Sequence, residues 1–224
     1  MSFFCCCHRL PGTSGEREPL TAQYTRQPSQ NTGVCSKEGT LAMKVVNVLE
    51  IDTLFSDITE TFNKQYRDHS AMEEAIRRLK EASGCAPTSS LTDCIDNIKR
   101  EHGACNLQVH MDGYSFSLIV KEKEVPADLE QAQRQVWELN RATKHVIATE
   151  TKLQEMICSV LQSQSQLAER MKAANPEYLD QVRLDANLRE NIQTVSQAKE
   201  LSKQYGKDAS SVLKEMAHLA GLIL

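Results

Sequence analysis

The feature that most constrains this chain is a row of positions that alternates steps of three and four residues without a break. Such steps place side chains on one stripe of an α-helix, and eight of the ten positions are apolar. A stripe this narrow cannot bury a long helix in a globule, so the helix requires one or two partner helices. We predict a first helix from about Lys44 to Ala82, ended by the loop SGCAP (residues 83–87). The ten positions are Val48, Ile51, Phe55, Ile58, Phe62, Gln65, His69, Met72, Ile76 and Leu79.

Two further rows predict two more long helices. The first runs from Pro126 to Ala174 as one uninterrupted helix, and the second runs from the break at Asn175-Pro176 to about Leu222. Asn suits the N-cap of a new helix and Pro suits its first turn. A short helix from Leu91 to His102 precedes them and is stopped by Gly103. The apolar positions that we assign to a coiled-coil interface in these two rows are Val136, Leu139, Val146, Leu153, Ile157, Val160, Leu167, Leu188, Ile192 and Val195.

Two arrangements fit the break at Asn175-Pro176. Helices of nearly equal length on either side of a breaker favour an antiparallel α-hairpin. A single rod kinked at Pro176 competes with it, because no Gly is present for the usual left-handed exit from the preceding helix. The first helix also has two options, since it can complete a three-helix bundle within the chain or pair with another chain.

Between the helices, the period of the apolar pattern changes to two. Residues 106–120 therefore predict a β-hairpin within a segment that spans residues 104–125. Asp112-Gly113 is a pair that a two-residue type I′ turn prefers, and we place the turn there. This register would pair Met111 with Tyr114, and two residues further out it would pair Val109 with Phe116.

Four polar residues occupy positions in the apolar rows: Gln65, His69, Glu150 and Gln164. Buried polar groups in a seam can fix register and partner at some cost in stability. The alternative for Gln65 and His69 is that both side chains turn out to water. If Glu150 is buried, it requires a cationic neighbour, because an unpaired carboxylate would otherwise take up a proton.

The first 42 residues have a different character. They contain several Pro and Gly among polar residues and few large apolar groups, which predicts a disordered leader. Organised sequence begins at Met43, so we expect that the leader is an optional extension. The alternative is a lipid anchor, in which Cys5, Cys6 and Cys7 are S-acylated.

The composition argues against several classes of function. The net charge of −4 gives no basic field for nucleic acid, and no apolar run is long enough to span a bilayer. No phosphate-binding loop or catalytic constellation is present, and we predict no cofactor. His102 and Cys105 lie three apart with Cys94 in reach, which is too little for a zinc site. The eight cysteines are scattered, which favours free thiols in a reducing compartment.

The sequence therefore predicts a mainly α protein, an elongated coiled-coil or helical bundle with one β-hairpin inserted between helices. The order helix, hairpin, helix resembles the layout of prefoldin subunits, which hold unfolded clients. The third long helix and the Pro-containing loop depart from that layout, so the resemblance implies no function here.

Two functions fit this architecture. The first is a non-enzymatic scaffold subunit of an intracellular, cytoplasmic complex that binds other coiled-coil proteins or a second copy of itself. Centrosomes, kinetochores and cilia use many such chains, which is an analogy of architecture alone. The second is a membrane-associated trafficking adaptor that is anchored through the acylated cysteines.

Overall fold

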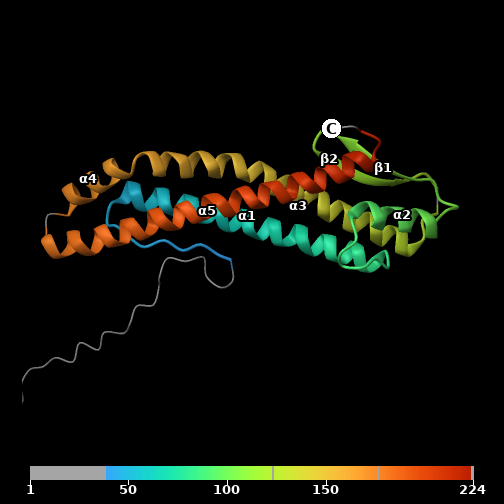
Figure 1. Ribbon diagram of the computed structural model, residues 1–224, viewed down its shortest axis with the longest axis horizontal. Coiled ribbons are helices and arrows are strands. Elements are labelled where there is room, and N and C mark those ends of the chain that lie inside the picture. Colours follow the sequence, from blue (N-terminus) through green and yellow to red (C-terminus); the bar gives the residue numbers. More distant parts are fainter. Residues whose placement is uncertain (1–38, 123, 176, 223–224) are drawn as a thin grey trace, which may run out of the picture. The chain divides into compact units, whose positions relative to one another are not determined.

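The computed structural model describes residues 39–122, 124–175 and 177–222, which all belong to one compact unit (Figure 1). The mainly helical fold with one antiparallel hairpin between helices is confirmed. In chain order the elements are α1 (Leu49–Ala82), α2 (Leu91–Glu101), β1 (Leu107–Asp112), β2 (Ser115–Val120), α3 (Ala127–Gln162), α4 (Gln164–Ala174) and α5 (Tyr178–Leu219).

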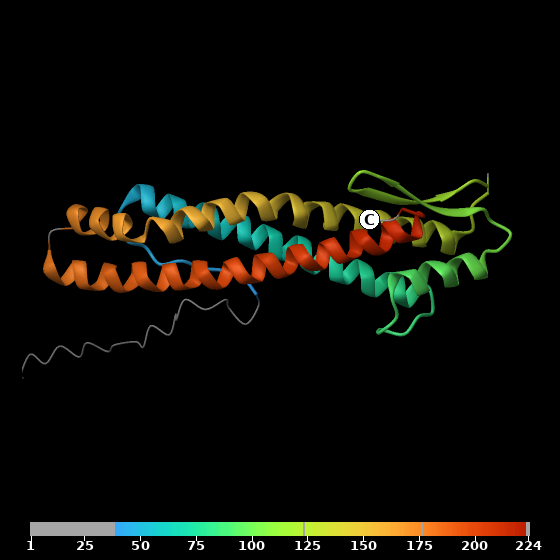
Figure 2. The ribbon, with the colours of Figure 1, turned by 45° about the horizontal axis from the view of Figure 1, so that its top comes forward.

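The long helices lie side by side as a three-helix bundle (Figures 1 and 2). α3 runs antiparallel to α1, α4 extends α3, and after residues 175–177 the chain reverses so that α5 returns along both. The apolar rows of the three helices face one another and form the core of the bundle. α2 packs beside α5 and α1, and Leu91 donates its backbone N–H to Glu215 Oε2 of α5 at 2.9 Å.

An extended segment, residues 39–48, precedes α1 and packs against α1 and α5. Leu41, which the sequence assigned to the leader, is buried, and it exchanges backbone hydrogen bonds with the side chain of Asn63 on α1. Lys44 does the same with Asn191 of α5. Because these amides hold the segment extended, α1 begins at Leu49 and not at the predicted Lys44.

The β-hairpin has the predicted faces but not the predicted register. Asp112 pairs with Ser115, and Met111 pairs with Phe116, so the two-residue turn is Gly113-Tyr114 and not Asp112-Gly113. Gly113 has φ +55° while Tyr114 lies outside the positive region, which is the pattern of a type II′ turn with Gly first. A shift of two residues keeps every side chain on its face, and so the apolar pattern could not exclude it.

The predicted helix from Pro126 to Ala174 is interrupted at Ser163. The Ser163 hydroxyl donates to the backbone oxygen of Ser159 at 2.7 Å, a competing local bond that bends helices. Ser163 therefore separates α3 from α4, with φ −101° and ψ 14°.

The N-cap prediction for Asn175 is also wrong, because its side chain amide donates to Met171 O and closes the end of α4.

Candidate partner-binding surfaces

The apolar row positions form the interior of this chain's own bundle. Val48, Ile76 and Ile192 are half-buried against the core, and the other positions that the sequence assigned to a coiled-coil interface are buried. The predicted interface residues therefore pack α1, α3, α4 and α5 against each other, and the surfaces considered below lie outside this core.

Gln65 and His69 are buried between helices and do not turn out to water. Gln65 is fully buried, and its amide nitrogen lies 3.4 Å from the backbone oxygens of Val146 on α3 and Ser202 on α5. His69 Nε2 lies 3.0 Å from Asp208 Oδ2. The His69 ring packs on Tyr205 with a centroid separation of 4.2 Å. Both residues therefore join α1 to α5 within the chain.

Glu150 lacks the cationic neighbour that the sequence predicted. The described part of the chain offers it no ion pair, and its carboxylate packs on the backbone of α5, where a Cβ at Gly206 would overlap it. Glycine at this position thus admits a carboxylate where any other residue would fill the space. Burial raises the pKa of Glu150 above its usual value of 4.5. Gln164, by contrast, is exposed at the start of α4.

The remaining sequence predictions concern the N-terminal cysteines and metal ligands. Cys5, Cys6 and Cys7 lie outside the described residues, so acylation stays a prediction. Within the described ranges no group of three His, Cys, Asp or Glu is arranged to hold a metal ion. No helix among the described residues is both long and apolar enough to cross a membrane.

Large apolar side chains are exposed where α4 meets α5. Tyr178, Leu179 and Val182 begin α5, and they are 75%, 81% and 55% exposed; we call these three residues the apolar tip. Leu49, at 83%, and Val45, at 60%, are exposed near the same end of the bundle. The apolar row of α5 begins only at Leu184, so the sequence signal for the tip is the run of apolar residues ahead of that row. We did not single out this signal in the sequence.

The groove between α1 and α3 is a second accessible surface. Segment 39–48 and α2 pack on α1 and α5, and the β-hairpin packs on α3 and α5. Three hollows along the α1–α3 groove, of about 650, 300 and 330 Å³, are lined by residues of α1 and α3. We call this surface the α1–α3 groove.

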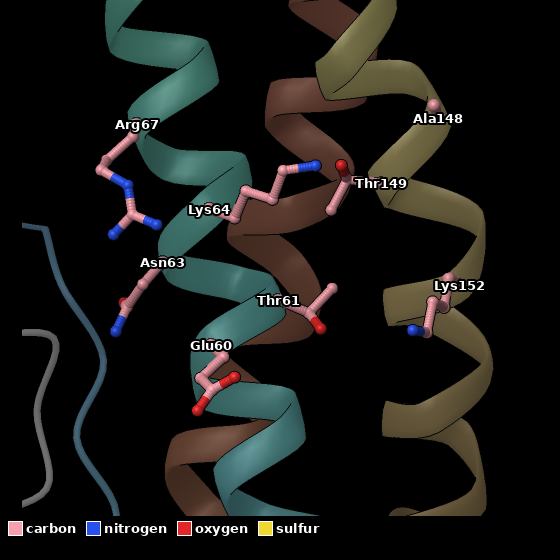
Figure 3. A pocket seen from close by; sticks show the side chains of 8 residues that line it. All are labelled: Glu60, Thr61, Asn63, Lys64, Arg67, Ala148, Thr149 and Lys152. Carbon is pink, nitrogen blue, oxygen red and sulfur yellow. The ribbon is translucent and has the colours of Figure 1, made fainter.

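The largest hollow, shown in Figure 3, is rich in uncompensated positive charge. Lys64 extends from α1 toward Thr149 of α3, and Lys152 faces it from α3. No described residue forms an ion pair with Lys64, Arg67 or Lys152. The lining residues are Glu60, Thr61, Asn63, Lys64, Arg67, Ala148, Thr149 and Lys152.

The middle hollow is different, because its charges are largely paired with each other. Arg78 contacts both Glu74 and Glu138, and His145 lies 3.6 Å from Asp68. Trp137, the only tryptophan in the sequence, lies on its wall and is 56% exposed.

Comparisons with known proteins do not indicate a function for this chain. No family model, curated protein or solved structure matches this chain.

Proposed function

We propose that this chain is a non-enzymatic structural subunit of an intracellular multiprotein complex, of the kind found in centrosomes, kinetochores or cilia. The bundle serves as a rigid helical body, and other proteins of the complex bind to its surface. The observation that carries the proposal is the apolar tip, where Tyr178, Leu179 and Val182 expose most of their side chains.

Contiguous exposed apolar groups mark surfaces for association. Burial of a side chain of this size against a partner contributes about 1.5–3 kcal/mol. A helix start is also a suitable anchor, because α5 continues into the core through Leu184 and Leu188, which are buried. A partner held at the tip is thereby fixed to the whole bundle.

The test replaces the apolar tip in the full chain. The triple variant Tyr178→Ser, Leu179→Ser, Val182→Ser is expressed in cells beside the unaltered chain, and both are isolated with their partners and compared by quantitative mass spectrometry. We expect a defined set of proteins to co-purify with the unaltered chain and to be depleted at least tenfold with the variant.

The matched control removes exposed apolar groups elsewhere. Tyr114→Ser combined with Ile119→Ser alters the β-hairpin, where these side chains are 71% and 38% exposed. Circular dichroism establishes that both variants remain helical. Retention of every partner by the triple variant, or turnover of a substrate by the purified chain, would overturn the proposal.

A further inference from the structure

We propose that the α1–α3 groove receives one α-helix of a partner protein, and that this helix carries acidic side chains along its flanks. The inference rests on the proposed function as a subunit of a complex, and it specifies a second surface and the chemistry of its occupant. Most of the residues that line this groove lie outside the apolar core of the bundle, and Ala75 and Ala142 belong to both.

The geometry of the groove is that of a helix-binding seam. On each wall one row of lining residues is spaced by alternating steps of three and four, which is the repeat that a third helix packed along both would meet. The α1 wall spans roughly 25 Å at 1.5 Å per residue, or nearly five helical turns. These two rows are Thr61, Lys64, Asp68, Ala71, Ala75 and Arg78 on α1, and Gln131, Gln135, Glu138, Ala142, His145, Thr149 and Lys152 on α3.

Side-chain size along the floor of the groove permits close approach. Ala71, Ala75, Ala142 and Thr149 lie between the long charged side chains of the rim. Small residues let a helix backbone lie deep in a groove, while the stems of lysine and arginine pack along its sides. Trp137 adds an aromatic contact on the rim, with the Arg141 guanidinium 5.4 Å from the ring centroid.

A buried polar atom in the groove also lacks a partner. The Gln135 side chain is 7% exposed, and no described residue donates a hydrogen bond to its carbonyl oxygen Oε1. Buried acceptors of this kind are normally satisfied. Gln135 lines the third hollow, and its Oε1 has almost no accessible surface, so a donor on the incoming helix would satisfy this oxygen once the side chain turned toward the groove.

Charge decides which kind of helix fits. The three hollows are lined by six Lys or Arg side chains and four Asp or Glu side chains, although the whole chain has a net charge of −4. In the middle hollow Glu74 and Glu138 are already paired with Arg78. The surplus therefore lies at cations of the largest hollow that have no ion pair among the described residues, which are Lys64, Lys152 and Arg67. Acidic side chains on the partner would pair with these lysines, and they would steer it into this groove and fix its direction.

The experiment uses a photo-crosslinking amino acid, benzoylphenylalanine, placed in the full chain in cells. Ala148 and Ala71 are exposed groove positions, and Lys207, which is exposed on α5, is the control. Circular dichroism first establishes that each substituted chain keeps its helical content. Crosslinked segments are then sequenced by mass spectrometry.

We expect both groove positions to crosslink to one helical segment with Asp or Glu flanking an apolar stripe, at a yield at least tenfold above Lys207. Lys64→Glu combined with Lys152→Glu should reduce the yield at Ala148 at least tenfold. A matched variant that reverses two lysines outside the groove, Lys203→Glu with Lys207→Glu, should leave the yield unchanged.

Three results would overturn the inference. These are groove crosslinks no stronger than the control, a crosslinked segment that is basic or belongs to a second copy of this chain, and a yield indifferent to charge reversal. None of them affects the apolar tip. If the tip variant loses its partners and any of these three results is also obtained, the groove proposal is rejected. The proposed function is then still supported.

Discussion

At the scale of single residues, the most informative position is Glu150. Its place in an apolar row predicted a buried carboxylate with a cationic partner, and the structure instead packs it on the backbone at Gly206. A desolvated carboxylate without a cation favours the protonated form, and this is why burial raises the pKa of Glu150.

This arrangement makes stability depend on pH with a definite sign. Because the folded chain binds this proton more tightly than the unfolded chain does, the contribution of Glu150 is fully present below pH 4.5 and is lost as the pH rises through the higher folded pKa. Glu150→Gln should therefore raise the Tm at pH 7, and the difference from the unaltered chain should shrink toward pH 4.

Thermal unfolding followed by circular dichroism across this range is the measurement. Glu155→Gln, at an exposed position of the same helix, is the control and should change the Tm equally at both ends of the range. A Glu150→Gln variant that lowers the Tm at pH 7 would show that the ionised carboxylate stabilises the fold.

For Gln65 and His69 the sequence left two alternatives open, and the structure selects one of them. Gln65 and His69 were recognised as polar positions in an apolar row, and the structure shows both buried. The sequence could not choose between burial and exposure, because that depends on whether a second helix offers a polar partner. Asp208, which lies 3.0 Å from His69, is 139 residues away along the chain.

At the scale of elements, the β-hairpin shows what residue periodicity and turn preference can and cannot predict. Period-two alternation correctly predicted two strands and their apolar faces, while turn preference chose the wrong pair of residues. The observed turn depends on Gly113, which has φ +55°, and not on Asp112, which ends β1.

Substitutions at the turn test this register. Gly113→Ala should lower the free energy of unfolding by about 1–2 kcal/mol, since alanine adopts positive φ only with strain. Tyr114→Ala and Asp112→Ala should each stay within about 0.5 kcal/mol of the unaltered chain. The measurement is urea-induced unfolding of the full chain. Equal losses for Asp112→Ala and Gly113→Ala would instead indicate a turn centred on Asp112-Gly113.

Helix boundaries were predicted less well than helix existence. α1 begins later than expected, and α3 ends at Gln162 although the row of apolar positions continues through Leu167 to Met171. The periodic signal reports which face of a helix is buried, and it is preserved across a local break such as that at Ser163. Boundaries depend on side chain hydrogen bonds that periodicity does not contain.

At the scale of the bundle, segment 39–48 packs on α1 and α5 and leaves the α1–α3 groove accessible. Asn191 is 2% exposed and holds this segment through bonds of 2.8 Å from Lys44 N and 2.7 Å to Lys44 O. The residues that bind each other here are far apart in sequence, and composition alone had assigned part of the segment to a disordered leader.

Removal of this amide should loosen the segment. Asn191→Ala should cost about 1–3 kcal/mol, because it leaves the partly buried backbone groups of Lys44 without partners. We expect earlier unfolding in guanidinium chloride and faster cleavage by trypsin after Lys44. Asn187→Ala, which removes an exposed bond to Val45 O, is the control and should have less than half the effect. Equal losses in the two variants would show that burial of the Asn191 contact is unimportant.

The sequence by itself determined the helical class, the three long helices, the hairpin strands and the apolar faces, because each follows from periodicity along a single element. Only the tertiary structure decided that the apolar rows meet within one chain, where α1 begins, which polar side chains are buried and which surfaces remain accessible. Those outcomes depend on contacts between residues remote in sequence. The α1–α3 groove is an example. Each of its walls is a row on one helix that shows no site by itself, and the groove forms only where α1 and α3 pack side by side.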